Sequence, residues 1–84
     1  MILLKTDGTV EPMPDKSLSA MQKAVGGYIE IVGLPDGRMI VIDEEGKYKD
    51  YQINEKATEL TKGLLHEFDV IVGDAILAEK GEIE

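Results

Sequence analysis

The stretch 17–32, SLSAMQKAVGGYIEIV, decides the fold because the period of its apolar residues changes at a pair of glycines. Before the glycines, Leu18, Met21 and Val25 recur at the spacing of one helical face. A serine can cap the start of this helix, since its oxygen accepts a free first-turn N–H. Gly26 stands where helices commonly end in a left-handed residue, so we expect the helix to stop there.

After the glycines, the segment 28–32 is predicted to be a β-strand, because it is aromatic and β-branched. Ile29 and Ile31 share one face, which we expect to pack under the helical stripe. Tyr28 and Glu30 lie on the other, less apolar face. They are therefore candidates to contact a ligand or a partner.

Short strands separated by turn signals make up most of the remaining chain. We expect strands at 2–5, 9–13, 38–43, 68–72 and 75–78, and an extended segment at 48–53. Pro12 and Pro14 cannot donate to a ladder, so 9–13 is predicted to be an edge strand. Gly73-Asp74 reads either as a hairpin turn of the II′ type or as a bulge.

A second helix is expected after Asn54, which is a favourable N-cap residue. Ala57, Leu60 and Leu64 would form its buried stripe. Gly63 weakens the helix interior, so the helix is predicted to fray or stop near it.

Together these elements predict an α+β fold: a mostly antiparallel sheet of five to six short strands with two helices. The helices lie between groups of strands rather than after every strand, which disfavours a parallel sheet. Residues 1–84 are predicted to form one domain, with a charged end at 79–84 that frays. Because the chain is short and 38–43 is apolar on both faces, we expect a homodimer that buries more apolar surface.

The chain is strongly acidic, with 17 Asp and Glu against 9 Lys and Arg, for a net charge of −8. This balance disfavours direct binding of nucleic acid, whose phosphates are neutralised mainly by Lys and Arg. The sequence has no cysteine, which excludes disulfides and thiolate metal sites. The apolar run at 1–4 is too short for a signal peptide or a membrane span, so we expect a cytoplasmic protein without membrane contact.

No motif marks a catalytic or metal site. The acidic turn 43–47 lacks the alternating acids and the twelfth-position Glu of a calcium loop. His66, the only histidine, has no second His or Cys to complete a metal set. Its spacing from Tyr28, Glu30 and Arg38 does not bring these groups together. We therefore expect a protein that is not an enzyme and uses no metal or cofactor.

The run Val25-Gly26-Gly27-Tyr28-Ile29-Glu30 resembles the most specific part of a small family of unknown function. The following hairpin, the DEEGK turn, the helix-opening Asn54 and the DVIVGDAIL segment extend the resemblance over roughly 18–77. This family is common in phages and mobile elements of Gram-positive bacteria. The resemblance implies a phage or prophage setting in the bacterial cytoplasm, and it implies no activity or catalytic residue.

These features predict a small accessory protein that binds a host factor or a small signalling molecule without catalysis. The candidate binding residues are polar or aromatic side chains on strand faces and turns: Tyr28, Glu30, Arg38, Tyr48 and Tyr51. Arg38 would matter most for a phosphate ligand, because its guanidinium can hold two oxygens at once. The alternatives are an acidic DNA mimic that inhibits a host DNA-binding enzyme, or a structural subunit of a phage complex.

Overall fold

The computed structural model describes residues 1–64 and 70–83, which form the predicted α+β fold. One antiparallel sheet has the strand order β2-β1-β5-β4-β3. Its strands are β1 (Ile2–Leu4), β2 (Val10–Pro12), β3 (Ile29–Gly33), β4 (Met39–Asp43) and β5 (Ala75–Ala78). The helices are α1 (Leu18–Val25), the short 3-10 helix η1 (Gly46–Tyr48) and α2 (Glu55–Leu60).

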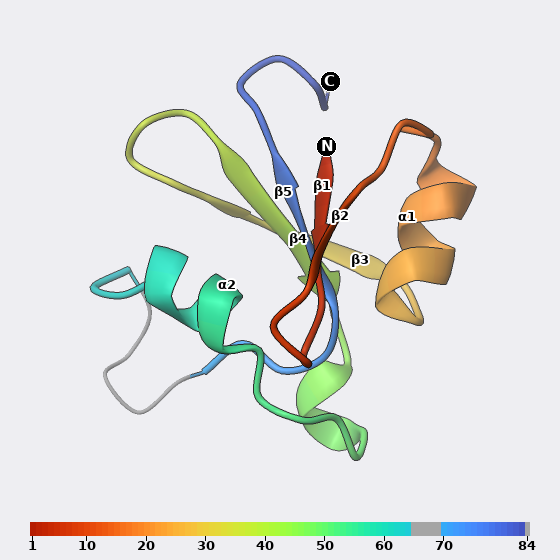
Figure 1. The fold of residues 1–84 in the computed structure, drawn as a ribbon, viewed down its shortest axis with the longest axis vertical. Helices are drawn as coiled ribbons and strands as arrows, with labels where there is room; N and C mark the ends of the chain where they lie inside the picture. Colours follow the sequence, from red (N-terminus) through yellow and green to blue (C-terminus); the bar gives the residue numbers. More distant parts are fainter. Residues whose placement is uncertain (65–69, 84) are drawn as a thin grey trace.

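The two α-helices cover opposite faces of the sheet, which Figure 1 shows nearly edge-on with β2 in front and β3 behind. Each face carries its own apolar cluster, because successive side chains of a strand point to opposite faces. The cluster under α1 contains Met21, Val25, Val41 and Ile76, and the cluster under α2 contains Leu4, Leu34, Ile40, Ala57, Ile71, Ala75 and Leu77. β4 contributes to both clusters, as the apolar pattern of 38–43 predicts, and β5 does so as well.

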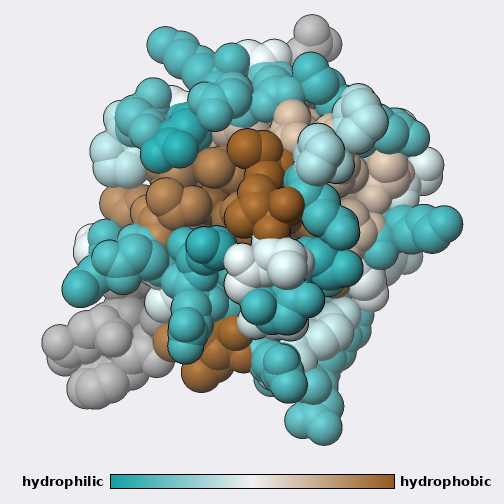
Figure 2. Space-filling view, in the orientation of Figure 1, coloured by the Kyte–Doolittle hydropathy of each residue, from teal (hydrophilic) through white to brown (hydrophobic). Residues whose placement is uncertain are grey.

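The short helix α2 leaves part of its sheet face incompletely covered. Ile2, Val32, Ile42 and Leu60 pack against the α2 cluster but are only partly buried. In Figure 2, apolar side chains gather in the middle of the visible surface, and hydrophilic side chains surround them. The α2 face therefore retains apolar surface next to polar groups.

The capping residues of α1 agree with the sequence, whereas one residue of its stripe does not. The Ser17 hydroxyl oxygen accepts a hydrogen bond from the Ala20 N–H at 3.2 Å, and Gly26 ends the helix with φ 94°. The prediction that Leu18 is buried is wrong, since 55% of it is exposed. Leu18 is the first helical residue, and the helix buries only Met21 and Val25 from the later turns.

Three further predictions along the chain need correction. Tyr48 belongs to η1 instead of an extended segment, because the N–H groups of Tyr48 and Lys49 bond three residues back. Ile31 is 44% exposed, although Ile29 packs against the α1 cluster as expected. Leu64 is exposed, since α2 ends at Leu60 and Leu64 lies beyond it.

The region before β5 bends rather than forming a hairpin. His66 and residues 68–69, at the start of the predicted strand 68–72, lie outside the described residues. Within the rest of that strand, Val72 makes one antiparallel bridge to Ile53. Gly73, with φ 79°, then turns the chain into β5, which pairs with β1 and β4. Gly73-Asp74 is therefore not a hairpin turn.

The proline in β2 sits at the sheet edge, as predicted. The Met13 N–H donates to the Met1 carbonyl and the Lys5 N–H donates to the Thr9 carbonyl, at 2.9 and 3.0 Å. Hydrogen bonding alternates along an antiparallel pair, so Pro12 falls at a position whose backbone faces away from β1. Its missing N–H costs no hydrogen bond within the sheet.

Two ionic contacts hold the segment 79–83 near the start of the chain. The Glu82 carboxylate accepts a hydrogen bond from the Met1 amino group at 2.8 Å and lies 3.0 Å from Lys16 Nζ. Ile83 packs against the α1 cluster, and residue 84 lies outside the described part. No helix within 1–64 and 70–83 is long and apolar enough to cross a membrane.

Asn54 is the polar residue that joins the sheet to α2. Its side-chain oxygen accepts the Ala57 N–H at 3.1 Å, which is the N-cap interaction expected from the sequence. Its amide nitrogen donates to the carbonyls of Leu4 and Gly73 at 2.8 and 2.9 Å. Asn54 is fully buried, so all three bonds are shielded from water.

Asn54→Ala is expected to lower the free energy of unfolding by about 2–4 kcal/mol. The substitution removes a helix cap and the side-chain amide that donates to the carbonyls of Leu4 and Gly73. Urea denaturation followed by circular dichroism measures this change. The control Glu59→Ala alters an exposed residue of the same helix and should shift stability by less than about 0.5 kcal/mol. Equal effects of the two variants would contradict the assigned role of Asn54.

Candidate functional site

A buried carboxylate lies at the end of β4. The Asp43 side chain is 1% exposed, and its Oδ2 accepts hydrogen bonds from Lys49 Nζ at 2.6 Å and from the Tyr51 hydroxyl at 2.9 Å. Its Oδ1 accepts the Glu45 N–H at 2.9 Å. Because both oxygens are satisfied, the charge is tolerated in an otherwise apolar setting.

Lys49 connects this carboxylate to the corner between α1 and β3. Its ammonium group also donates to the Gly26 carbonyl at 2.9 Å and lies 5.8 Å from the centroid of the Tyr51 ring. The loop after β4 is therefore tied to the end of α1 by one cation. We call Asp43, Lys49 and Tyr51 the Asp43 network.

The Asp43 network explains why two glycines follow α1. A Cβ atom at Gly27 would lie 2.8 Å from Lys49 Nζ and 2.9 Å from Asp43 Oδ1. A Cβ atom at Gly26 would lie 2.5 Å from the Tyr51 hydroxyl, and Gly26 also has a positive φ. Gly26 is thus needed for both its backbone conformation and the space it leaves, whereas Gly27 is needed for space alone.

The network sets the ionisation of its members. Burial by itself would raise the pKa of Asp43, but hydrogen bonds from Lys49, the Glu45 backbone and Tyr51 hold that pKa below its usual 3.8. The bond to Asp43 raises the pKa of Lys49 above 10.5. Burial, reinforced by Asp43, raises the pKa of the Tyr51 phenol above 10.0. At neutral pH the network therefore contains one carboxylate, one ammonium group and one neutral phenol.

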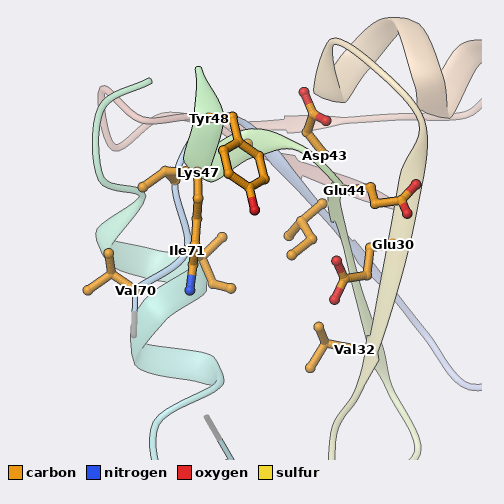
Figure 3. A pocket seen from close by; sticks show the side chains of 11 residues that line it. Glu30, Val32, Asp43, Glu44, Lys47, Tyr48, Val70 and Ile71 are labelled. Atoms are coloured by element: carbon orange, nitrogen blue, oxygen red, sulfur yellow. The ribbon is translucent and has the colours of Figure 1, made fainter. Parts of the chain in front are cut away.

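Beside the network, a groove runs between the β3–β4 pair and the segment 70–72, with η1 at one end (Figure 3). Its volume is about 290 Å³. Charged, aromatic and aliphatic side chains contribute to its lining. The lining residues are Glu30, Val32, Ile42, Asp43, Glu44, Gly46, Lys47, Tyr48, Val70, Ile71 and Val72.

The two walls of the groove differ in chemistry. Figure 3 shows Glu30 and Glu44 on the β3–β4 side, where Val32 extends the wall. Lys47 and Ile71 lie on the opposite side. The Asp43 carboxylate points away from the groove, toward its own network. The groove therefore combines aliphatic walls with the Glu30 carboxylate, and Glu44 lines the same side with its carboxylate directed away from Lys47.

The structure brings only some of the five predicted binding residues together. Glu30 and Tyr48 both line the groove, and Tyr48 is 89% exposed at its end. Tyr51 belongs to the Asp43 network, and Tyr28 lies in a shallow depression beside Gly27 and Lys49.

Arg38 lies apart from these residues, in the turn between β3 and β4. Its Nε donates to Asp36 Oδ2 at 2.7 Å, and its backbone N–H donates to Asp36 Oδ1 at 3.0 Å. Arg38 precedes the first residue of β4, whereas the groove adjoins the last residues of that strand. The role of Arg38 in holding a phosphate stays a prediction.

Sequence reasoning missed the Asp43 network, because it placed Asp43 at the end of the predicted strand 38–43 and in the acidic turn 43–47 without assigning it a partner. The signal was present in the strand alternation. Val41 packs under α1, and Asp43 follows it two residues later on the same face. A charged residue at a core-facing position requires a buried partner, and sequence spacing alone does not identify Lys49 as that partner.

A family model described as a domain of unknown function, DUF3846, matches residues 1–84. The chain belongs to the DUF3846 family. Comparison of this DUF3846 chain with curated proteins and with solved structures gave no match. Within 1–64 and 70–83, no group of three or more His, Asp or Glu side chains is placed to hold a metal ion.

Gly27→Ala is expected to destabilise this DUF3846 domain by about 1–3 kcal/mol, because the added methyl group must displace Lys49 or Asp43. Chemical denaturation measures the effect. The control is Gly33→Ala in β3, where a Cβ atom meets nothing within 4 Å. That control should be neutral or stabilising by up to about 1 kcal/mol. A larger loss in Gly33→Ala than in Gly27→Ala would refute the steric argument.

Asp43→Asn is expected to lower stability at pH 7 by about 2 kcal/mol, because its charge-assisted hydrogen bonds are lost. The folded-state pKa of Asp43 lies below its unfolded value, so its contribution is complete above about pH 5. That contribution is lost as the pH falls through 3.8 and below. The difference between wild type and variant should therefore shrink on acidification.

Urea denaturation at a series of pH values tests this dependence. Asp50→Asn changes an exposed aspartate of the same loop and should alter stability by less than about 0.5 kcal/mol at neutral pH. At the alkaline end, Lys49 and Tyr51 both have raised pKa values, so wild-type stability should fall above about pH 10. A wild-type advantage over Asp43→Asn that stays constant down to pH 2 would rule out the ionised carboxylate as its source.

Proposed function

We propose that this protein is a small accessory protein of a phage or mobile element that binds a host factor without catalysis. The group it recognises is a cation on an apolar stem, such as an arginine or lysine side chain on the host protein. The observation that carries the proposal is the groove, in which the Glu30 carboxylate faces aliphatic side chains and Glu44 lines the same side. The phage setting rests on the sequence resemblance described above.

The charge of the groove supports a cationic ligand. The Glu30 carboxylate faces the groove, Glu44 lies on the same side, and the whole chain carries a net charge of −8, which attracts basic partners. Tyr48 adds an exposed aromatic face at the end of the groove, where a guanidinium can stack. Lys47 lies on the opposite wall, so an incoming cation meets the carboxylates on the β3–β4 side.

The size and lining of the groove favour a side chain over a whole small molecule. Its volume of about 290 Å³ lies at the lower limit of the roughly 300–1,000 Å³ typical of small-molecule pockets. Val32, Ile42 and Ile71 can contact the methylene stem of an arginine while its head remains near Glu30. A host protein is therefore favoured over a small signalling molecule.

Titration of the isotope-labelled protein with N-acetyl-arginine methylamide, followed by NMR, tests this binding. We expect amide shifts concentrated at Glu30, Glu44, Tyr48 and Ile71. Glu30→Gln should weaken binding by about two- to fivefold, since an exposed ion pair contributes up to about 1 kcal/mol. Arg38→Ala should leave binding unchanged, because Arg38 lies in another turn.

Two controls separate a site from general acidity. Glu59→Gln removes the same charge from exposed α2 and should not weaken binding. N-acetyl-glutamate methylamide should produce no shifts in the groove. The proposal fails if Glu59→Gln and Glu30→Gln weaken binding equally, or if the acidic probe shifts the same amides.

A further inference from the structure

The outer edge of β3 carries unpaired backbone groups. The Glu44 N–H donates to the Tyr28 carbonyl and the Leu34 N–H donates to the Arg38 carbonyl, both at 2.8 Å. Because bonding alternates along an antiparallel pair, the even-numbered residues of β3 bond to β4. The N–H and C=O groups of Ile29, Ile31 and Gly33 then point outward. Among the residues that the structure describes, no strand pairs with this edge.

The two edges of the sheet differ in their protection. Proteins commonly block an exposed edge with a proline, a lysine or a bulge, since unpaired strands associate. β2 has Pro12 at an outward position, whereas β3 has neither proline nor lysine. Ile31, in the middle of β3, is 44% exposed. The β3 edge is therefore an open site for strand pairing.

We propose that β3 pairs with β3 of a second copy of this chain, antiparallel about a twofold axis through Ile31. In this register Ile31 faces Ile31 of the second copy, and Ile29 faces Gly33. Each of these pairs can exchange two backbone hydrogen bonds, because all three residues direct their backbone groups outward. The exposed Ile31 side chains meet across the axis and lose their contact with water.

Repulsion between carboxylates disfavours the neighbouring register that is centred on Glu30. Pairing centred on Ile31 places Glu30 opposite Val32 of the second copy, and all five residues of β3 are paired. Moving the centre by one residue to Glu30 would place the two Glu30 carboxylates directly opposite each other, which is destabilising. The interface is self-complementary, as a twofold dimer requires.

The dimer would have a defined arrangement of faces. A twofold axis perpendicular to the sheet keeps both copies of α1 on one face and both grooves on the other. Glu30 and Val32 of each groove lie on β3, so the grooves would flank the axis. This inference concerns the β3 edge alone and does not depend on what the groove binds.

Sedimentation velocity over a concentration series tests the dimer. We expect the wild type to sediment as a dimer that dissociates on dilution, and Ile31→Lys to sediment as a monomer with an unchanged circular dichroism spectrum. The matched control is Val10→Lys, which changes an equally exposed residue (49%) on the β2 edge and should stay dimeric. A wild type that sediments as a monomer at every concentration would overturn the proposal.

A second variant covers the case in which Ile31→Lys unfolds. The sequence has no cysteine, so Ile31→Cys introduces one thiol per chain. A short bismaleimide should link two Ile31→Cys chains efficiently at low protein concentration and should link Val10→Cys chains poorly. Equal linking of the two variants would place the contact elsewhere and overturn the assignment of β3.

Discussion

The charge buried at Asp43 is the constraint on which the rest of the structure depends. A carboxylate with 1% of its side chain exposed is stable only when hydrogen-bond donors surround it, and those donors come from two side chains and one backbone amide. Lys49 in turn bonds to the carbonyl of Gly26. One ion pair thereby connects β4, the loop that follows it and the end of α1.

The same constraint positions the candidate binding groove. η1 lies between Asp43 and Lys49, so the two ends of this segment are held by the ion pair. Tyr48 projects from the segment at the end of the groove, and Glu44 follows Asp43 directly. Loss of the ion pair would free the segment that carries both groups. The proposed binding would therefore be coupled to stability in this loop, and variants of the groove itself are the cleaner probes of that binding.

The fold could be predicted from sequence because it depends on local signals. These signals act within a few residues: the N-cap Asn54, the helix stop at Gly26 and the apolar alternation of β4. The structure places each of them as expected. Leu18 and Ile31 could not be assigned correctly in the same way, because Leu18 precedes the buried turns of α1 and Ile31 lies on an edge strand. The groove also escaped prediction, since segment 70–72 and β3 are distant in sequence and meet only through the tertiary fold.

The contrast between the two sheet edges connects these observations. A proline destabilises most strands because it lacks a backbone N–H. At the outward position of β2, however, Pro12 removes a donor that could recruit another strand. β3 has no such residue, although it is equally an edge and carries an exposed isoleucine. An edge that is unprotected and apolar would promote aggregation unless it has a specific partner. Because the chain is small and the pattern of β3 is complementary to itself, the proposed second copy would satisfy that need while leaving the groove on its own face of the sheet.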